Sequence, residues 1–264
     1  ASLKPFSACS VIHPPMNDDP LVERAFFWES KPVLRHIYGD LFQRMATHVT
    51  SGTTLEVGGG TGLGKIFLKN VISSDILAAP SLDLVSDCHI LPFKDNSMGN
   101  IVMLDVLHHL DTPVLFLLEA SRVLKKGGRL IMIEPAITPL SWLFYSLFHE
   151  EPVDMKASPF GELRPSEAKD PFEGNQAIPT LMFHRQLKRT LQAIPAFSVV
   201  QNEAISLWCY PLSGGFQTWS LLPVWLAPTL LRLERFIEPM LGRLIGFRML
   251  TVLENTGNGS ETHA

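Results

Sequence analysis

Cysteine, charged residues and basic runs are all scarce in this chain of 264 residues. The three cysteines, Cys9, Cys88 and Cys209, lie far apart without a CxxC pair, which excludes a disulfide framework and a cysteine-based zinc site. Charged residues make up 18% of the chain, below the roughly 25% of an average soluble protein. Lys and Arg number 22 against 26 Asp and Glu, with no basic stripe, so nucleic acid is not an expected partner.

Two segments without Asp, Glu, Lys or Arg account for the low charge. They cover residues 135–148 and 204–231 and contain four of the five tryptophans. The second is long enough to span a bilayer, but prolines and glycines interrupt it, so no transmembrane segment is expected. Two interpretations stay open: core and lid helices, or an apolar acceptor pocket or peripheral membrane face. Because no signal-peptide pattern opens the sequence, we expect a cytoplasmic protein, with membrane association as an alternative.

The hydrophobic period divides the chain into three parts. Residues 1–50 show helix starts and helical apolar spacing, residues 51–134 alternate short strands with helices or loops, and residues 135–264 end in two further strands. This pattern predicts one α/β domain with a Rossmann-like, doubly wound, mostly parallel sheet of about seven strands. A helical N-terminal cap and a helical insertion in the C-terminal half complete it. The expected strands are residues 54–57, 71–74, 82–86, 100–104, 129–134, 197–207 and 248–254.

Three connecting segments carry further expectations. A helix is expected to start at Pro113 and to end before Lys125-Lys126-Gly127-Gly128, because cations and glycine favour a helix C-terminus. Residues 152–179 are rich in proline and charge, which predicts a long surface excursion. A helix over residues 185–194 is expected to follow it.

The most informative segment is the glycine loop of residues 55–65, which follows an expected strand. A nucleotide-binding P-loop needs Ser or Thr where this chain has Ile66. A dinucleotide fingerprint needs a final glycine where this chain has Leu63 or Lys65, which weakens an NAD-linked interpretation. The pattern that fits is acid-x-Gly-x-Gly-x-Gly, formed by Glu56, Gly58, Gly60 and Gly62.

With this pattern the chain resembles the class I S-adenosylmethionine-dependent methyltransferases, in particular the small-molecule enzymes of the type 11-like group. Three more motifs follow in the family's order: LPFKDNS at residues 91–97, VLHHL at 106–110 and RVLKKGGRL at 122–130. The other two thirds of the chain carry no comparably diagnostic motif. The resemblance implies an enzyme that transfers a methyl group from S-adenosyl-L-methionine to a small or lipid-like acceptor. The alternative is a non-catalytic cofactor-binding module that acts as a partner or sensor subunit.

The resemblance also implies a position for the cofactor. Glycines of the loop would line its methionine and ribose parts, with Glu56 near the methionine amino group. Asp75 would accept both ribose hydroxyls, since a carboxylate offers two acceptor oxygens, and Asp87 would meet the adenine amino group. The full set of implied cofactor-binding residues is Glu56, Gly58, Gly59, Gly60, Gly62, Asp75, Ile76, Asp87, Cys88, His89, Leu104 and Asp105.

The spacing of the acidic residues departs from the family pattern. Glu56 and Asp75 are 19 residues apart, and Asp75 and Asp87 only 12. Parallel neighbouring strands normally need a crossover of about a dozen residues or more. We therefore expect a shortened first helix, no second helix, and an extended crossing over residues 76–81.

His108 and His109 are the candidate catalytic residues. They follow the fourth expected strand, and histidine has the pKa of a general base for a hydroxyl acceptor; the alternative is packing or contact with the cofactor. Glu134, at the end of the fifth strand, is a weaker acceptor-site candidate. Residues 149–151 and Asp154 have metal-binding side chains but no ligand spacing, so no metal is expected. Neither the acceptor and its methylated atom nor the oligomeric state follows from the sequence.

Overall fold

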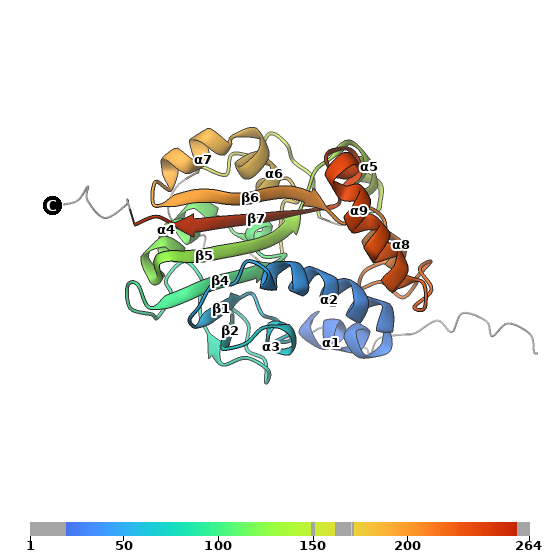
Figure 1. Cartoon of the computed structure of the whole chain (residues 1–264), viewed down its shortest axis with the longest axis horizontal. Helices are drawn as coiled ribbons and strands as arrows, with labels where there is room; N and C mark the ends of the chain where they lie inside the picture. Colours follow the sequence, from blue (N-terminus) through green and yellow to red (C-terminus); the bar gives the residue numbers. More distant parts are fainter. Residues whose placement is uncertain (1–19, 149–150, 162–169, 171, 258–264) are drawn as a thin grey trace, which may run out of the picture.

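The structure, a computed structural model, describes residues 20–148, 151–161, 170 and 172–257, and within them seven strands form one sheet. The strand order is β3-β2-β1-β4-β5-β7-β6, with β1 to β5 parallel and β7 antiparallel to both neighbours (Figure 1). The predicted fold class is therefore confirmed. The strands are β1 (Thr54–Val57), β2 (Val71–Asp75), β3 (Leu84–Val85), β4 (Met98–Leu104), β5 (Leu124–Pro135), β6 (Phe197–Ile205) and β7 (Arg248–Asn255).

Helices cover both faces of this sheet (Figure 1). Short turns extend two of the connections: a 3₁₀ turn, η1 (Leu107–His109), and a π turn, η2 (Leu181–Arg185). The helices are α1 (Pro20–Ser30), α2 (Pro32–Ala46), α3 (Gly64–Phe67), α4 (Pro113–Val123), α5 (Pro139–Phe148), α6 (Ile178–Thr180), α7 (Leu187–Ala193), α8 (Cys209–Ser213) and α9 (Ala227–Ile245).

Alternating side chains of the central strands fill the two layers of the core. In β4, Ile101 and Met103 pack with α4 and α6, whereas Val102 points to the opposite face and packs with α2. The same alternation occurs along β5. Because both faces are covered, the central strands contain consecutive apolar residues, at positions 101–104 in β4 and 130–133 in β5, as is typical of parallel sheets.

The N-terminal and C-terminal helices form one layer on the same face of the sheet. α2 contacts both α8 and α9. The Arg44 guanidinium of α2 donates to both carboxylate oxygens of Glu238 in α9, at 2.6 and 3.0 Å. The predicted helical cap is thus confirmed over residues 20–46, and it is joined to the end of the chain.

The connections between strands confirm one expectation and correct another. α3 has only four residues, and no helix lies between β2 and β3. The helix expected from Pro113 to just before Lys125 is confirmed, since α4 ends at Val123, but the strand expected over residues 129–134 begins earlier, at Leu124. Leu124 pairs with Met98 before a register shift, and Gly127 has a φ of 77°. A bulge that uses the conformational freedom of this glycine therefore lies within a strand that is longer than predicted.

The predicted surface excursion is also wrong in part. Residues 176–180 are buried, because they lead into α6, which packs beside the end of β5 and η1. His149 and Glu150 lie outside the described residues. No helix in the described part of the chain is both long enough and apolar enough to cross a membrane.

Candidate functional site

The glycine loop leaves the carboxyl end of β1 in a conformation that only glycine adopts readily. Gly58 and Gly60 have φ angles of 68° and 50°. The buried Glu56 fixes the loop, because one carboxylate oxygen accepts from the Gly64 amide at 2.8 Å and the other from the Ser73 hydroxyl at 2.5 Å. Burial raises the pKa of Glu56. Both oxygens of this carboxylate are therefore used within the protein.

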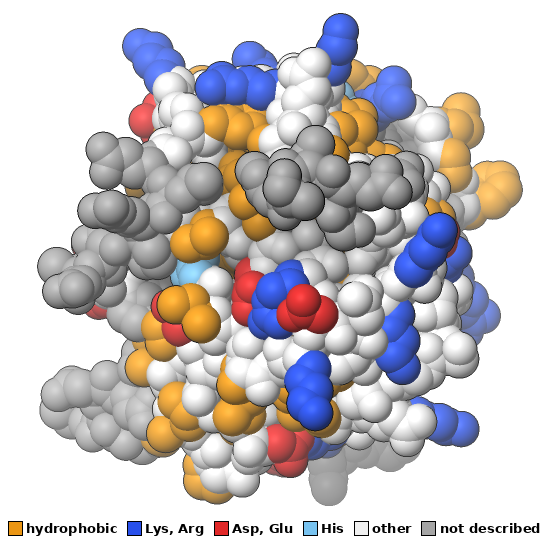
Figure 2. Space-filling view, turned by 90° about the vertical axis from the view of Figure 1, so that its left-hand side faces the viewer, with side chains coloured by type: hydrophobic (Ala, Val, Ile, Leu, Met, Phe, Trp, Pro, Cys, Tyr) orange, Lys and Arg blue, Asp and Glu red, His pale blue; other side chains and the backbone are white. Residues whose placement is uncertain are grey.

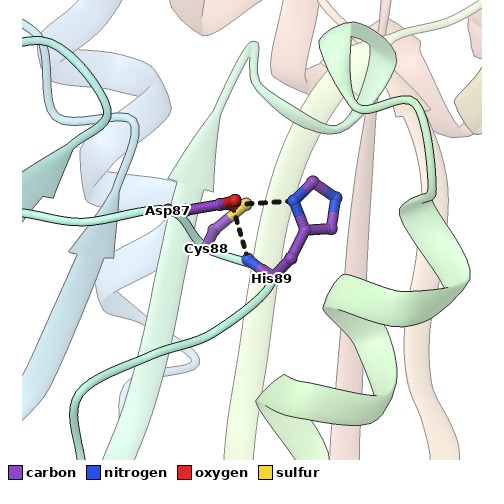
Figure 3. A group of neighbouring side chains, drawn as sticks. All are labelled: Asp87, Cys88 and His89. Carbon is purple, nitrogen blue, oxygen red and sulfur yellow. Dashed lines mark hydrogen bonds and ion pairs between the residues drawn. The ribbon is translucent and has the colours of Figure 1, made fainter. Parts of the chain in front are cut away.

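Asp75 and Asp87 follow the ends of β2 and β3. The Asp75 carboxylate accepts from the amides of Gly60, at 2.8 Å, and Leu77, at 3.1 Å. Asp87 Oδ1 accepts from the His89 amide at 2.9 Å and lies 2.7 Å from His89 Nδ1 (Figure 3). His89 Nε2 is buried and has no hydrogen-bond partner among the described residues. It is therefore available to a ligand.

Two adjoining cavities open at this edge of the sheet. The larger, of about 190 Å³, has Asp75, Asp87 and His89 along its wall. The smaller, of about 60 Å³, lies between the glycine loop, the end of β4 and α2. Arg24 of α1 and Asp105 line both, so the two form one site. Apolar side chains complete the walls, namely Tyr38, Phe42, Met45 and Phe216 in the smaller cavity and Leu77, Val106, Leu110 and Phe172 in the larger.

The structure brings all the predicted cofactor-binding residues except Gly62 to these cavities. A Cβ on Gly62 would lie 2.8 Å from Ser81 Cβ, and its φ is 74°, so this glycine permits a turn against the next loop. The contacts of the other residues with a cofactor stay a prediction. Sequence reasoning missed Arg24, Tyr38, Phe172 and Phe216, which lie far from the glycine loop in sequence and belong to no motif.

A buried ion pair lies beside the smaller cavity. Arg248 of β7 is 2% exposed, pairs with Asp105 and stacks on the Tyr210 ring at 4.1 Å. The chain's three tyrosines, Tyr38, Tyr145 and Tyr210, surround this pair, and burial raises the pKa of each. Arg248 Nε is buried without a hydrogen-bond partner in the described part of the chain. A carboxylate thus faces the cavity with a fixed cation behind it.

His108 lies behind the cavities, between two carboxylates. Its Nδ1 is 2.8 Å from Glu134 and its Nε2 3.3 Å from Glu151. Burial alone would lower its pKa, but these two partners outweigh burial and raise the pKa of His108 to about 9. Glu134 also accepts from the amides of Val106 and Leu107, at 2.9 and 2.8 Å. This 2% exposed residue therefore holds η1 in place and lines neither cavity, in contrast to its expected position at the acceptor site.

His109 is the one of the two candidate histidines that lines a cavity, the larger one. Its ring lies 4.0 Å from that of His108. Burial and the neighbouring charge of His108 lower the pKa of His109 to about 4. The pair therefore combines a charged and a neutral imidazole at pH 7.

Two groups of side chains lie close enough together to hold a metal ion: Asp87 with Cys88 and His89, and His108 with His109 and Glu151. Burial raises the pKa of the Cys88 thiol, which disfavours the thiolate that a metal needs. Figure 3 shows Asp87 already engaged with His89, and both nitrogens of His108 face carboxylates. We assign a metal to neither group.

Comparison with known proteins finds a described domain over part of this site. Residues 55–132 match the family described as "Methyltransferase domain". A SAM-dependent methyltransferase from Archaeoglobus fulgidus is similar in structure, with a TM-score of 0.51, 14% identity, and coverage of 87% of this chain and 99% of that chain. Geranyl diphosphate C-methyltransferase from Streptomyces coelicolor has a TM-score of 0.47, 13% identity, and coverage of 87% and 84%. These likenesses concern the fold. No curated protein matches the sequence.

Proposed function

We propose that this chain is a class I S-adenosylmethionine-dependent methyltransferase whose acceptor is small and apolar or lipid-like. One observation carries the proposal. The small cavity beside the glycine loop is walled by the apolar side chains of Tyr38, Phe42, Met45 and Phe216, and Asp105 also lines it. Such a wall favours an apolar body with a single polar group to be methylated.

The cavity residues fit the cofactor by their hydrogen-bonding chemistry. Ribose hydroxyls and the adenine amino group are donors, and Asp75, Asp87 and the unpartnered His89 Nε2 offer acceptors. The methionine part carries a carboxylate, and Arg24 is the only Lys or Arg among the described residues that line the two cavities. When bound, S-adenosylmethionine supplies a methyl group activated by its sulfonium charge. Arg24 would hold the carboxylate and Asp75 the ribose.

Asp105 is the general base that the geometry favours for a hydroxyl acceptor. Its carboxylate lines both cavities, and Arg248 fixes its orientation from behind. A carboxylate oxygen of Asp105 would take the hydroxyl proton as the acceptor oxygen attacks. His108 lacks a free lone pair when protonated, and His109, which lines only the larger cavity, is the alternative base.

Transfer of a radiolabelled methyl group tests this function. The chain is incubated with labelled S-adenosylmethionine and either a lipid extract or a set of water-soluble alcohols and amines. We expect label in the organic phase, and we expect titration with S-adenosylhomocysteine to show binding to the folded protein. Label only in polar products contradicts the apolar acceptor, and binding without transfer to any acceptor supports the non-catalytic alternative.

Asp105→Asn tests the base within the same experiment. The amide keeps the shape of the side chain but cannot take the proton, so we expect kcat to fall about 100-fold. The affinity for S-adenosylhomocysteine should change less, by about threefold or under, and so shows that the variant is folded. Asp95→Asn is the matched control, because Asp95 is exposed and pairs with Arg122 far from both cavities. An unchanged kcat in Asp105→Asn contradicts this role.

A further inference from the structure

α5, residues 214–226 and α9 together expose large hydrophobic side chains, and we call their outer surface the apolar face. α9 contacts both α5 and α8, and Figure 1 places these helices together at the right-hand end of the molecule. α5 buries Ser141 and Tyr145 and turns apolar residues outward. The most exposed members of the apolar face, between 64% and 79% exposed, are Leu147, Phe148, Leu221, Trp225, Phe236 and Met240.

The opposite end of the molecule has a different surface. Figure 2 shows Lys and Arg side chains spread around that end, with Asp and Glu near its centre and hydrophobic side chains between them. A mixed surface of this kind is ordinary for a protein in water. Most of the exposed large hydrophobic side chains among the described residues lie instead in α5, residues 214–226 and α9.

The exposed charges of α9 are positive. α9 contains two glutamates, and both are buried: Glu234 accepts from backbone amides near α8, and Glu238 pairs with Arg44. Arg232 and Arg243 are exposed and form no ion pair within the part of the chain that the structure describes. Residues 135–148 and 204–231 add no charge. The outer side of α9 therefore combines apolar side chains with cations.

The apolar face is connected to the smaller cavity through residues 214–226. Phe216 of this segment lines the cavity, whereas Trp219 and Trp225 are exposed. The Lys31 ammonium fixes this segment. It donates to the carbonyl oxygens of Gly215, Gln217 and Trp219 and of the preceding Ser213, at 2.6 to 2.9 Å. One short segment thus reaches from the cavity wall to the outer surface.

We propose that the apolar face lies on an anionic lipid bilayer. A helix that combines apolar side chains with cations is the arrangement that binds at the headgroup boundary, and tryptophan is enriched at that depth. The exposed cations of α9 favour an anionic lipid surface, whereas an apolar protein partner would not require these cations. Bilayer binding does not depend on methyl transfer; delivery of an apolar acceptor from the bilayer rests on the proposed function.

Vesicle sedimentation with the full chain tests the proposal. We expect the protein to pellet with vesicles of phosphatidylcholine mixed with phosphatidylglycerol, and to pellet less with phosphatidylcholine alone. Phe236→Ser with Met240→Ser should weaken this binding by about tenfold or more, since two apolar side chains that would insert into the bilayer are lost. Arg232→Gln with Arg243→Gln should weaken binding to the anionic vesicles only. Ile66→Ser with Ile90→Ser is the matched control, because both side chains are exposed away from the apolar face.

Several outcomes overturn the proposal. The proposal that the apolar face binds a bilayer is contradicted if the protein pellets with neither vesicle. It is also contradicted if wild type and the Phe236→Ser, Met240→Ser variant pellet equally. A stable dimer that these two substitutions dissociate would assign the apolar face to a second copy of the chain. Titration of every variant with S-adenosylhomocysteine shows that it is folded and separates failure of bilayer binding from failure of the proposed function.

Discussion

Arg24 lies where two cavities meet, and its chemistry predicts which part of the cofactor it holds. Its guanidinium lies within 5.7 Å of the rings of Phe172 and Phe216, which direct it across the site. If it pairs with the methionine carboxylate, Arg24→Met should weaken S-adenosylhomocysteine binding about 10- to 100-fold, the usual effect of one charge-assisted hydrogen bond. Isothermal titration measures this change.

Methylthioadenosine provides the internal control for Arg24, because it keeps the adenosine and the thioether but lacks the carboxylate. Its affinity should be the same in wild type and Arg24→Met to within about threefold. Equal losses for both ligands would instead mean that Arg24 only supports the cavity wall. Arg35→Met, which removes an exposed cation from the neighbouring helix, should change neither affinity.

His108 predicts a pH dependence of stability. Its pKa is about 9 in the folded protein and about 6.5 in an unfolded chain, so the folded state holds a proton that the unfolded state releases. The resulting stabilisation is complete below about pH 6.5 and is lost as the pH rises through 9. The two pKa values correspond to roughly 3 kcal/mol. Melting temperatures between pH 6 and pH 10 measure the effect.

His108→Gln isolates this contribution, because glutamine does not titrate. Burial lowers the pKa of Lys31 to about 8, which acts in the opposite direction, so the comparison must be between wild type and variant at each pH. We expect the stability difference between them to shrink as the pH approaches 10. His36→Gln removes an exposed histidine and should leave the pH dependence unchanged. A difference that is constant with pH would show that His108 is neutral.

At the scale of elements, one side chain fixes the segment that follows α8. Lys31 is 5% exposed, and Lys31→Met would remove the donor from its four carbonyl acceptors, of which those of Ser213 and Gly215 form buried hydrogen bonds. We expect a loss of about 3 kcal/mol in the free energy of unfolding and a weaker near-UV signal from the tryptophans of the segment. Lys188→Met, on the exposed side of α7, should change stability by less than about 0.5 kcal/mol. The carbonyl oxygens belong to Ser213, Gly215, Gln217 and Trp219.

The elements near the glycine loop could be predicted because their constraints are local. The short spacing from Glu56 to Asp75 leaves no room for a long helix, and α3 has four residues. By contrast, the glycines after α4 suit either a helix end or a strand bulge, and only the pairing of Leu124 with Met98 decides between them.

The cavity wall opposite the glycine loop could not be predicted for a different reason. Arg24 and Tyr38 come from the N-terminal helices and Phe216 from the segment after α8, so their meeting depends on tertiary packing. The sequence placed Glu134 and His108 at neighbouring strand ends, as the structure does. Whether their side chains face the ligand or each other depends on burial, which no motif records.

At the scale of the whole molecule, the two charge-free segments contain both buried core residues and exposed apolar residues. Cys209 and Leu222 are buried in the core layer shared with α2, whereas Trp225 and Phe148 are exposed on the apolar face. The layer on this side of the sheet joins the two ends of the chain. Its stability therefore depends on contacts between residues almost 200 positions apart, and these contacts also position Tyr38 at the cavity.

The bond between Arg44 and Glu238 tests this dependence. Arg44→Met would leave the buried Glu238 carboxylate with only the Ser206 amide as a donor, so we expect unfolding free energy to fall by about 3 kcal/mol. Glu238→Gln in the same chain should restore part of the loss, with a coupling of about 2 kcal/mol in a double-mutant cycle by urea denaturation. Arg35→Met, which removes an exposed pair with Glu29, should cost under about 1 kcal/mol. Additive effects of Arg44→Met and Glu238→Gln would mean that this bond does not hold α2 and α9 together, which would leave that role to apolar packing and the ion pair between Arg235 and Asp40.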